Sequence, residues 1–337
     1  MIEIIFKDVG QGDSIFLKWK TADGLKYGVI DSNLNNKSNP ILDEIKHSQL
    51  NEIDFIILSH LHFDHFSGLA QVLNYCIEKR ITINNFYHTF QNQFFQLLKD
   101  LLATEDQKTV TKLFIASYRE ATTSGIIKNV QSITAAIKDH ALDSDFTLKF
   151  LSPIGRDYED FAEKQAKIDI NNKSTVPNLN CLSSIVKITN NKKAVLLTAD
   201  CCKNQLKRLT GHVEETFEVI QVPHHGSINN HAEKFWNSIK KGEDAVSLFS
   251  VGDVIRDKLP NKPVVEYFDQ AGFEIESTNY VYGIKEHFPL PVVTITKEAT
   301  KNNALLDVFS NSSSTSQMLN YDIPEKFQGD KIYELVS

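Results

Sequence analysis

The stretch that most constrains the fold is ILSHLHFDHFSG, residues 57–68, which places four possible metal ligands within six residues. It follows an apolar run that reads as a buried strand, and it precedes a segment with apolar residues at helical spacing. His60 and His62 are two apart on an extended segment, so they point the same way and can chelate one ion. Asp64 and His65 lie where the chain turns into the helix, so they are expected to face a second metal position near the first. This density of ligands predicts a metal site rather than a solvated polar loop.

Strand and helix patterns alternate along both halves of the chain. Residues 1–30 read as paired strands around a Gly-rich turn, and further strands and helices follow in each half. This alternation predicts an α/β (α+β layered) fold in which two mixed β-sheets lie between outer helices. Residues 91–141 show apolar spacing of three and four and are predicted as a helical insertion. Residues 155–180 are polar and charged and are predicted as a surface excursion.

The chain is expected to form one domain over residues 1–305. A low-complexity stretch, SNSSSTSQ, begins at Ser310, so residues 306–337 are predicted as a linker and a C-terminal tail.

The bulk composition excludes some classes of protein. The net charge of −7 gives no global attraction to nucleic acid or to an anionic membrane. No window reaches the length of a membrane span, and the N-terminus lacks a signal pattern. The spacing of the four cysteines fits neither a disulfide framework nor a zinc knuckle. We therefore predict reduced thiols, a cytoplasmic location and no membrane partner.

Two later segments offer further ligands directly after apolar strands. VLLTAD ends in Asp200, and VIQVPHHGS contains His224 and His225. A lone aspartate at a strand end is more often a cap or turn residue. Three such fragments rich in His and Asp together predict a dinuclear site in which a carboxylate bridges two ions.

The five segments DVGQGDS, VIDS, HLHFDH, LLTAD and PHHGS occur in the order typical of one family. They resemble the metallo-β-lactamase superfamily, most closely the metallohydrolase domain of ComEC-type competence proteins. The resemblance covers about residues 1 to 300. It implies an αββα sandwich with a di-metal site at one sheet edge, where a metal-bridging hydroxide attacks a phosphoester, thioester or lactam.

The resemblance also implies roles for the motif residues. His60 and His62 would hold the first ion, Asp64 and His65 would hold the second, and Asp200 would bridge both. Asp64 is in addition a candidate catalytic residue.

One histidine of the pair His224 and His225 would complete the shell of the second ion. The other would donate a proton to the leaving group or grip a phosphate oxygen, so both are candidate metal-binding and catalytic residues. Asp31 matches a position that orients a motif histidine from behind. Asn180 and Ser227 are expected beside the ligands.

Many superfamily members have a third histidine on the first ion, midway between the motif and the bridging aspartate. His88 ends a strand and is the better candidate here, whereas His140 is predicted to face solvent from a helix. Asp8, Gln11 and Asp13 would lie in a turn near the site, with structural or substrate-facing roles.

These patterns predict a metal-dependent hydrolase with two divalent ions. Zinc is expected for this ligand set, although manganese is admitted. A phosphodiester suits a two-metal site. The resemblance to competence-type domains, which are associated with DNA degradation, implies the substrate class, so a nuclease-like activity on nucleic acid or a nucleotide is the leading hypothesis. The alternatives are hydrolysis of a small molecule (a cyclic nucleotide, lactone or thioester) and a metal-poor protein that binds without turnover. A protein partner is expected through the helical insertion or the C-terminal tail.

Overall fold

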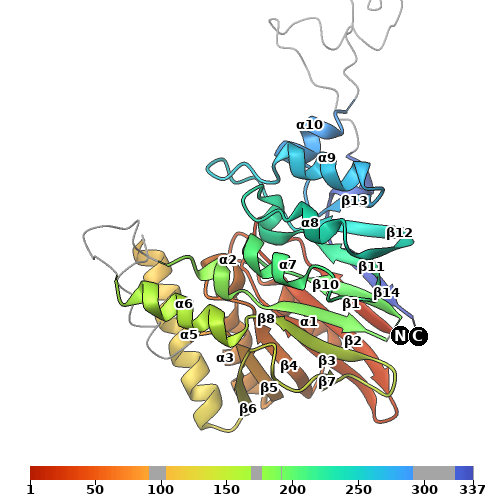
Figure 1. Cartoon of the computed structure of the whole chain (residues 1–337). Coiled ribbons are helices and arrows are strands. Elements are labelled where there is room, and N and C mark those ends of the chain that lie inside the picture. Colours follow the sequence, from red (N-terminus) through yellow and green to blue (C-terminus); the bar gives the residue numbers. More distant parts are fainter. Residues whose placement is uncertain (91–103, 168–176, 191, 291–322, 337) are drawn as a thin grey trace, which may run out of the picture.

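The strands form two seven-stranded sheets, and helices cover the outer face of each (Figure 1). The computed structural model describes residues 1–90, 104–167, 177–190, 192–290 and 323–336. The first sheet has the order β14-β1-β2-β3-β4-β5-β6. Its strands are β1 (Ile2–Phe6), β2 (Ile15–Thr21), β3 (Gly24–Ile30), β4 (Glu52–Leu58), β5 (Thr82–His88), β6 (Ile127–Ser132) and β14 (Lys331–Leu335).

The second sheet has the order β13-β12-β11-β10-β9-β8-β7. Its strands are β7 (His140–Ala141), β8 (Thr147–Ser152), β9 (Ile185–Thr189), β10 (Lys193–Leu197), β11 (Thr216–Gln221), β12 (Lys240–Phe249) and β13 (Glu274–Ser277). Both sheets are mixed. The strands β3, β4, β5 and β6 run parallel in the first, and β10, β11, β12 and β13 run parallel in the second.

Helices flank the sheets in two groups. The helices that pack on the first sheet are α1 (Pro40–Ser48), α3 (Leu69–Lys79), α5 (Glu105–Thr123) and α6 (Gly155–Gln165). Those on the second sheet are α7 (Lys203–Leu209), α8 (Glu233–Trp236), α9 (Lys262–Gln270) and α10 (Tyr282–His287). Short elements α2 (Phe63–Phe66), η2 (Leu179–Leu182), η3 (Pro223–Gly226) and η6 (Glu325–Phe327) lie in the connections.

The apolar residues divide into three layers, which explains the sandwich. One cluster joins the first sheet to its helices, a second fills the space between the sheets, and a third joins the second sheet to its helices. Trp19 and Phe55 stack between the sheets with ring centroids 5.8 Å apart. Burial of such large side chains is the main stabilising contribution to a domain of this size. The predicted αββα sandwich is confirmed.

Several predicted elements differ from the structure. Residues 126–141 do not continue a helix, because β6 and β7 extend the two sheets there. Their apolar spacing fits a helix as well as a strand, and pairing with a neighbouring strand decides the outcome. The first part of the predicted insertion, residues 91–103, lies outside the described residues. The expected surface excursion contains the eleven-residue helix α6, which buries Phe161 against the first sheet's helical layer.

The C-terminal segment contributes a strand to the body of the molecule. β14 pairs antiparallel with β1, with Ile4 opposite Tyr333, and forms the edge of the first sheet. The N and C labels therefore lie side by side in Figure 1. The Tyr333 hydroxyl donates a hydrogen bond to Glu276 Oε2 in the second sheet at 2.7 Å. Among the described helices, none is both long and apolar enough to cross a lipid bilayer.

Candidate metal centre

The possible ligands come together because they follow the carboxyl ends of parallel strands, one in the first sheet and two in the second. The histidine motif follows β4, Asp200 follows β10, and the His224–His225 pair follows β11. Carboxyl ends of parallel strands meet at the same sheet edge, which is where open α/β folds place their sites. Stacking the two sheets brings the two edges into contact.

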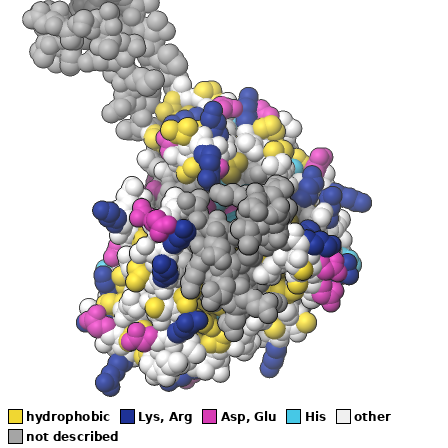
Figure 2. Space-filling view, turned by 90° about the vertical axis from the view of Figure 1, so that its left-hand side faces the viewer, with side chains coloured by type: hydrophobic (Ala, Val, Ile, Leu, Met, Phe, Trp, Pro, Cys, Tyr) yellow, Lys and Arg dark blue, Asp and Glu magenta, His cyan; other side chains and the backbone are white. Residues whose placement is uncertain are grey.

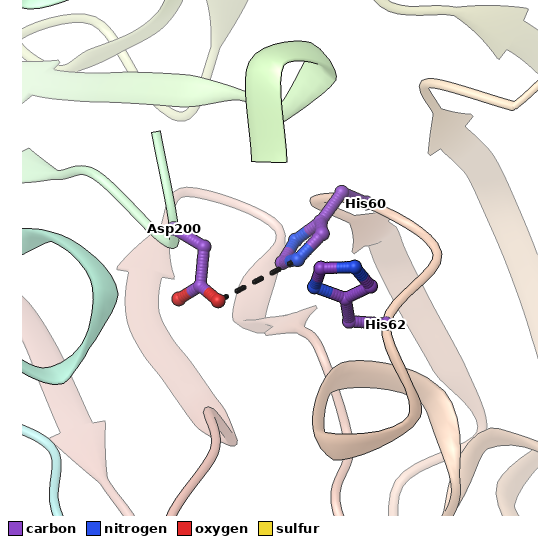
Figure 3. Close-up of side chains that lie close together, drawn as sticks. All are labelled: His60, His62 and Asp200. Atoms are coloured by element: carbon purple, nitrogen blue, oxygen red, sulfur yellow. Dashed lines mark ion pairs between the residues drawn. The ribbon is translucent and has the colours of Figure 1, made fainter. Parts of the chain in front are cut away.

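His60, His62 and Asp200 form the first cluster, whose ligand atoms all lie within 4.8 Å of one another (Figure 3). The rings of His60 and His62 lie 4.7 Å apart between centroids, on the extended segment before α2. His60 Nε2 lies 3.7 Å from Asp200 Oδ2. His60 therefore faces Oδ2 of Asp200, and His62 contributes its ligand atom to the same cluster.

Asp64, His65 and His225 form the second cluster. His225 Nε2 lies 3.5 Å from Asp64 Oδ2 and 3.5 Å from Asp200 Oδ1. His65 Nε2 lies 3.4 Å from the same Asp200 Oδ1. Asp200 thus turns one carboxylate oxygen to each cluster, which is the arrangement that a bridging carboxylate requires.

The loop that carries Asp200 is held by Gln221 at the end of β11. Gln221 Oε1 accepts hydrogen bonds from the backbone N–H groups of Thr198 and Ala199, both at 3.0 Å. Ala199 has a φ of +44°, a conformation that a side chain other than glycine adopts only under constraint. Sequence reasoning missed Gln221, because nothing in the pattern of β11 distinguishes it from an ordinary strand residue.

His224 and His225 both have positive φ values, so the short turn after Pro223 presents the two rings differently. His225 is buried, and its Nδ1 lies 2.7 Å from the carbonyl oxygen of Ser250. Because that carbonyl accepts the Nδ1 proton, the Nε2 lone pair of neutral His225 points into the second cluster. His225 is therefore the member of the pair that joins Asp64 and His65.

His224 is more exposed, with 29% of its side chain accessible, and it belongs to neither cluster. Its Nε2 lies 3.6 Å from Asp200 Oδ2. Its Nδ1 lies 2.9 Å from Asn230 Oδ1, while Asn230 Nδ2 donates to the carbonyls of Asp200 and Cys201. That donation fixes the amide orientation, so His224 Nδ1 carries the proton and Nε2 faces the site. Asn230 has no motif around it, and sequence reasoning missed it.

Asp31 lies behind His65, where the resemblance placed it. Its carboxylate is fully buried, and Oδ2 lies 2.7 Å from His65 Nδ1. It also accepts hydrogen bonds from the hydroxyl and the backbone N–H of Ser59, at 2.5 and 2.8 Å. Such a carboxylate–imidazole pair fixes the tautomer that leaves His65 Nε2 free to bind a metal.

Of the other expected residues, Asn180 and Ser227 lie at the site and His88 does not. Asn180 Nδ2 lies 3.3 Å from His224 Nδ1, so Asn180 borders the site. The backbone of Ser227 closes the turn by donating to the His224 carbonyl at 2.9 Å. His88 lies in none of the ligand clusters of the described residues, and its ring stacks on Phe90 at 3.7 Å. The structure therefore does not bring His88 to the first cluster.

His140 is not the solvent-facing helical residue that the sequence predicted. It lies in β7, where Nε2 is 2.7 Å from Asp54 Oδ2 and Nδ1 is 3.0 Å from the Tyr87 hydroxyl.

The electrostatics of the clusters fit divalent cations. Burial alone would raise the pKa of Asp200, but His225 and His65 hold it well below its usual value. Burial would lower the pKa of His65, but Asp200 and Asp31 raise it well above its usual value. Burial and the neighbouring imidazoles lower the pKa of His60. The ion-free site thus favours the ionised form of Asp200, which suits a bound cation.

Unsatisfied atoms give an independent test of this fit. The buried ligand atoms without a hydrogen-bond partner among the described residues include His60 Nε2, His65 Nε2, His225 Nε2 and Asp200 Oδ1. Buried polar atoms are normally paired, because an orphaned one costs about 1–3 kcal/mol. All four point into the clusters, so the residues present fit two bound metal ions.

A disulfide beside the site contradicts the prediction of four reduced thiols. Cys181 in η2 is joined to Cys202, the residue before α7. Cys181 is adjacent to Asn180, and Cys202 lies two residues after Asp200. The folded chain brings these cysteines together across a 21-residue separation that has no recognisable spacing. Cys76 and Cys201 are free and buried.

Comparison with known proteins gives one family match. Residues 28–121 match the model of the family described as "Metallo-beta-lactamase superfamily". This range contains Asp31 and the histidine motif, while Asp200 and the His224–His225 pair follow it. No curated protein matches the chain in sequence.

Several solved structures are similar in outline. The metallo-beta-lactamase fold protein YhfI from Bacillus subtilis is 10% identical, with a TM-score of 0.43 over 84% of this chain and 98% of that one. Zn²⁺-bound PqqB from Methylobacterium extorquens is 9% identical, with a TM-score of 0.45 over 82% and 98%. A long form of RNase Z from yeast is 13% identical, with a TM-score of 0.40 over 77% and 38%. At these values the similarities carry no conclusion about substrate.

Proposed function

Since the family match and the architecture support the metallo-β-lactamase superfamily, we propose that this chain is a metal-dependent hydrolase that cleaves phosphodiesters. The observation that carries the proposal is the pair of ligand clusters that share Asp200. The segments quoted above support a functional kinship with ComEC-type metallohydrolase domains.

Each cluster would hold one divalent ion. His60, His62 and Asp200 would bind the first, and Asp64, His65, His225 and Asp200 the second. Bound ions would supply a water molecule of lowered pKa as the nucleophile and would neutralise charge on the attacked phosphate. Zinc suits the imidazoles, and manganese suits the carboxylates.

His224 is proposed to act on the substrate. It lies at the edge of the site, and the proton on its Nδ1 is held by Asn230. When the ring is also protonated at Nε2, this atom can donate a proton to the leaving oxygen or a hydrogen bond to the phosphate. The partial exposure of His224 and the burial of His225 support this division of roles.

The surface near the site on the side of α7 and α8 supports an anionic substrate. Lys203 and Lys207 of α7 line a surface hollow of about 480 Å³ together with Lys234 of α8. α7 begins three residues after Asp200. Figure 2 shows basic and acidic side chains interspersed over the described part of one face, without a broad basic surface among the residues described there. These lysines would attract phosphate groups flanking the scissile one.

A hollow of about 490 Å³ on the Asp64 side has the opposite character. Asp8 and Asp253 contribute carboxylates to it, Asn35 and Asn36 contribute amides, and Phe63 contributes a ring. No lysine or arginine is among its described lining residues. This lining favours an uncharged group over a continuing phosphate chain, so a small phosphodiester such as a cyclic nucleotide is the second candidate substrate.

The proposal is tested by hydrolysis of bis-p-nitrophenyl phosphate, single-stranded DNA, RNA and a cyclic nucleotide, each with and without EDTA. We expect EDTA to abolish turnover, and His62→Ala to abolish it without loss of fold. His212→Ala, which changes an exposed histidine, is the matched control. Turnover that survives both EDTA and His62→Ala would refute the proposal. The relative rates on the polymers and the cyclic nucleotide decide between the two substrates. A cytoplasmic location and a partner bound through residues 91–141 or the C-terminal segment remain predictions.

A further inference from the structure

Asp13 is a buried carboxylate that the ligands proposed above for the two ions leave unexplained. It follows the turn after β1, and only 2% of the residue is exposed. Its Oδ1 has no hydrogen-bond partner among the described residues, and Oδ2 lies 3.7 Å from His65 Nδ1. The ligand atoms of Asp13, His65 and Asp200 all lie within 4.8 Å of one another.

The surroundings of Asp13 provide no permanent positive charge. In the described part of the chain, its ion-pair contact is with His65, whose Nδ1 already faces Asp31 at 2.7 Å. No described lysine or arginine forms an ion pair with it. A buried carboxylate without a cation costs several kcal/mol, and proteins therefore pair such groups or use them to bind metals. The position of Asp13 is explained if a cation occupies the space beside it.

The backbone is built to bring Asp13 this close. Gly12 has a φ of +124°, and a Cβ at this position would lie 2.3 Å from the carbonyl oxygen of Asp64. The N–H of Asp13 donates to that same carbonyl at 3.2 Å. On the other side, the Ser250 hydroxyl donates to the Gly12 carbonyl at 2.7 Å. The turn is therefore fixed between the loop that carries Asp64 and the loop that holds His225.

We infer that Asp13 is an additional ligand of the second metal ion. The second position then has carboxylates from Asp13, Asp64 and Asp200 beside two imidazoles, whereas the first has His60 and His62 with Asp200. Because carboxylates suit Mn²⁺ and imidazoles suit Zn²⁺, the second position prefers manganese more strongly than the first. This inference rests on the metal centre of the proposed function, and it adds a ligand and a metal preference to it.

The test compares metal binding by the full chain and by Asp13→Asn, after both have been stripped of metal. Mn²⁺ binding is followed by the loss of the free-ion electron paramagnetic resonance signal, and Zn²⁺ binding by competition with a chelating dye. We expect Asp13→Asn to weaken Mn²⁺ binding at one of two positions by at least about tenfold, with a smaller effect on Zn²⁺. Asp23→Asn, which removes an exposed carboxylate from the next hairpin, should leave both affinities unchanged.

Thermal unfolding separates a ligand from a structural residue. Asparagine removes an unpaired buried charge, so the metal-free variant should unfold at the wild-type temperature or above, while the increase caused by Mn²⁺ should shrink. An equal loss of stability with and without metal would show a structural role and overturn the inference. Unchanged Mn²⁺ binding in Asp13→Asn would overturn it too, while leaving the proposed function intact. A wild-type chain that binds neither metal would overturn both.

Discussion

Replacing Asp31 by asparagine tests whether the metal centre depends on residues that touch no ion. Asp31 receives hydrogen bonds from Ser59 and faces His65 Nδ1 at 2.7 Å, all without exposure to solvent. In Asp31→Asn, one oxygen can still accept from the Ser59 N–H. The new NH₂ group, however, meets the Nδ1–H of His65, so that two donors face each other. Relief of this contact moves the His65 proton to Nε2, where the second ion should bind.

The loss of such an outer partner typically weakens metal binding about 10–100-fold, which is about 1.4–2.7 kcal/mol. The steric volume hardly changes, so the fold should be retained. We expect isothermal titration of the metal-free variant with Zn²⁺ and with Mn²⁺ to show this loss at one of two positions.

The molecule offers a matched control for this experiment. Asp54 and His140 form the same kind of contact, 2.7 Å between Oδ2 and Nε2, away from the ligand clusters. Asp54→Asn should leave metal binding unchanged. Unchanged affinity in Asp31→Asn, or an equal loss in both variants, would refute the reasoning.

Two further predictions concern the turn beside the site and a buried histidine. Gly12→Ala should lower the unfolding free energy by roughly 1–3 kcal/mol and weaken metal binding, because its Cβ meets the Asp64 carbonyl. Gly24 has a similar φ of +121°, but a Cβ at this position would have no atom within 4 Å. Chemical denaturation of Gly24→Ala should therefore show a loss of stability, while its metal affinity should stay unchanged. Equal effects of the two substitutions on metal binding would contradict the prediction. Burial lowers the pKa of His88 from 6.5 to about 4 in the folded state. As the pH falls from 6.5 towards 4, the unfolded chain therefore binds a proton at His88 before the folded chain does, and the folded state loses stability. Urea titrations at pH 7 and pH 4 give the loss of unfolding free energy between these two pH values, and His88→Leu should make this loss smaller by about 3 kcal/mol. An unchanged loss in the variant would refute this prediction.

The fold was predictable because most strands carry local signals. Apolar runs of strand length ended by turn residues identified the central strands, and Asn39 and Pro40 mark the start of α1, where the Asn39 side chain accepts from Leu42 N–H. The errors fall where tertiary pairing decides, at β6 and β7.

The clustering of the candidate ligands was predictable because each follows a strand end and belongs to a recognisable segment. The residues that orient them were not, because Gln221, Asn230 and Ser250 act through one side-chain amide or backbone carbonyl that has no sequence signature. The Cys181–Cys202 disulfide was missed for a similar reason, since it depends on how η2 packs against the start of α7. The choice between His224 and His225 needed the backbone conformation of the turn itself.

The most direct test of the account is anomalous X-ray diffraction from crystals grown with Mn²⁺ or Zn²⁺ and recorded at the absorption edge of each metal. The account predicts two peaks on either side of Asp200, one beside His60 and His62 and the other beside Asp64, His65 and His225. The absence of any peak within bonding distance of Asp200 would contradict it.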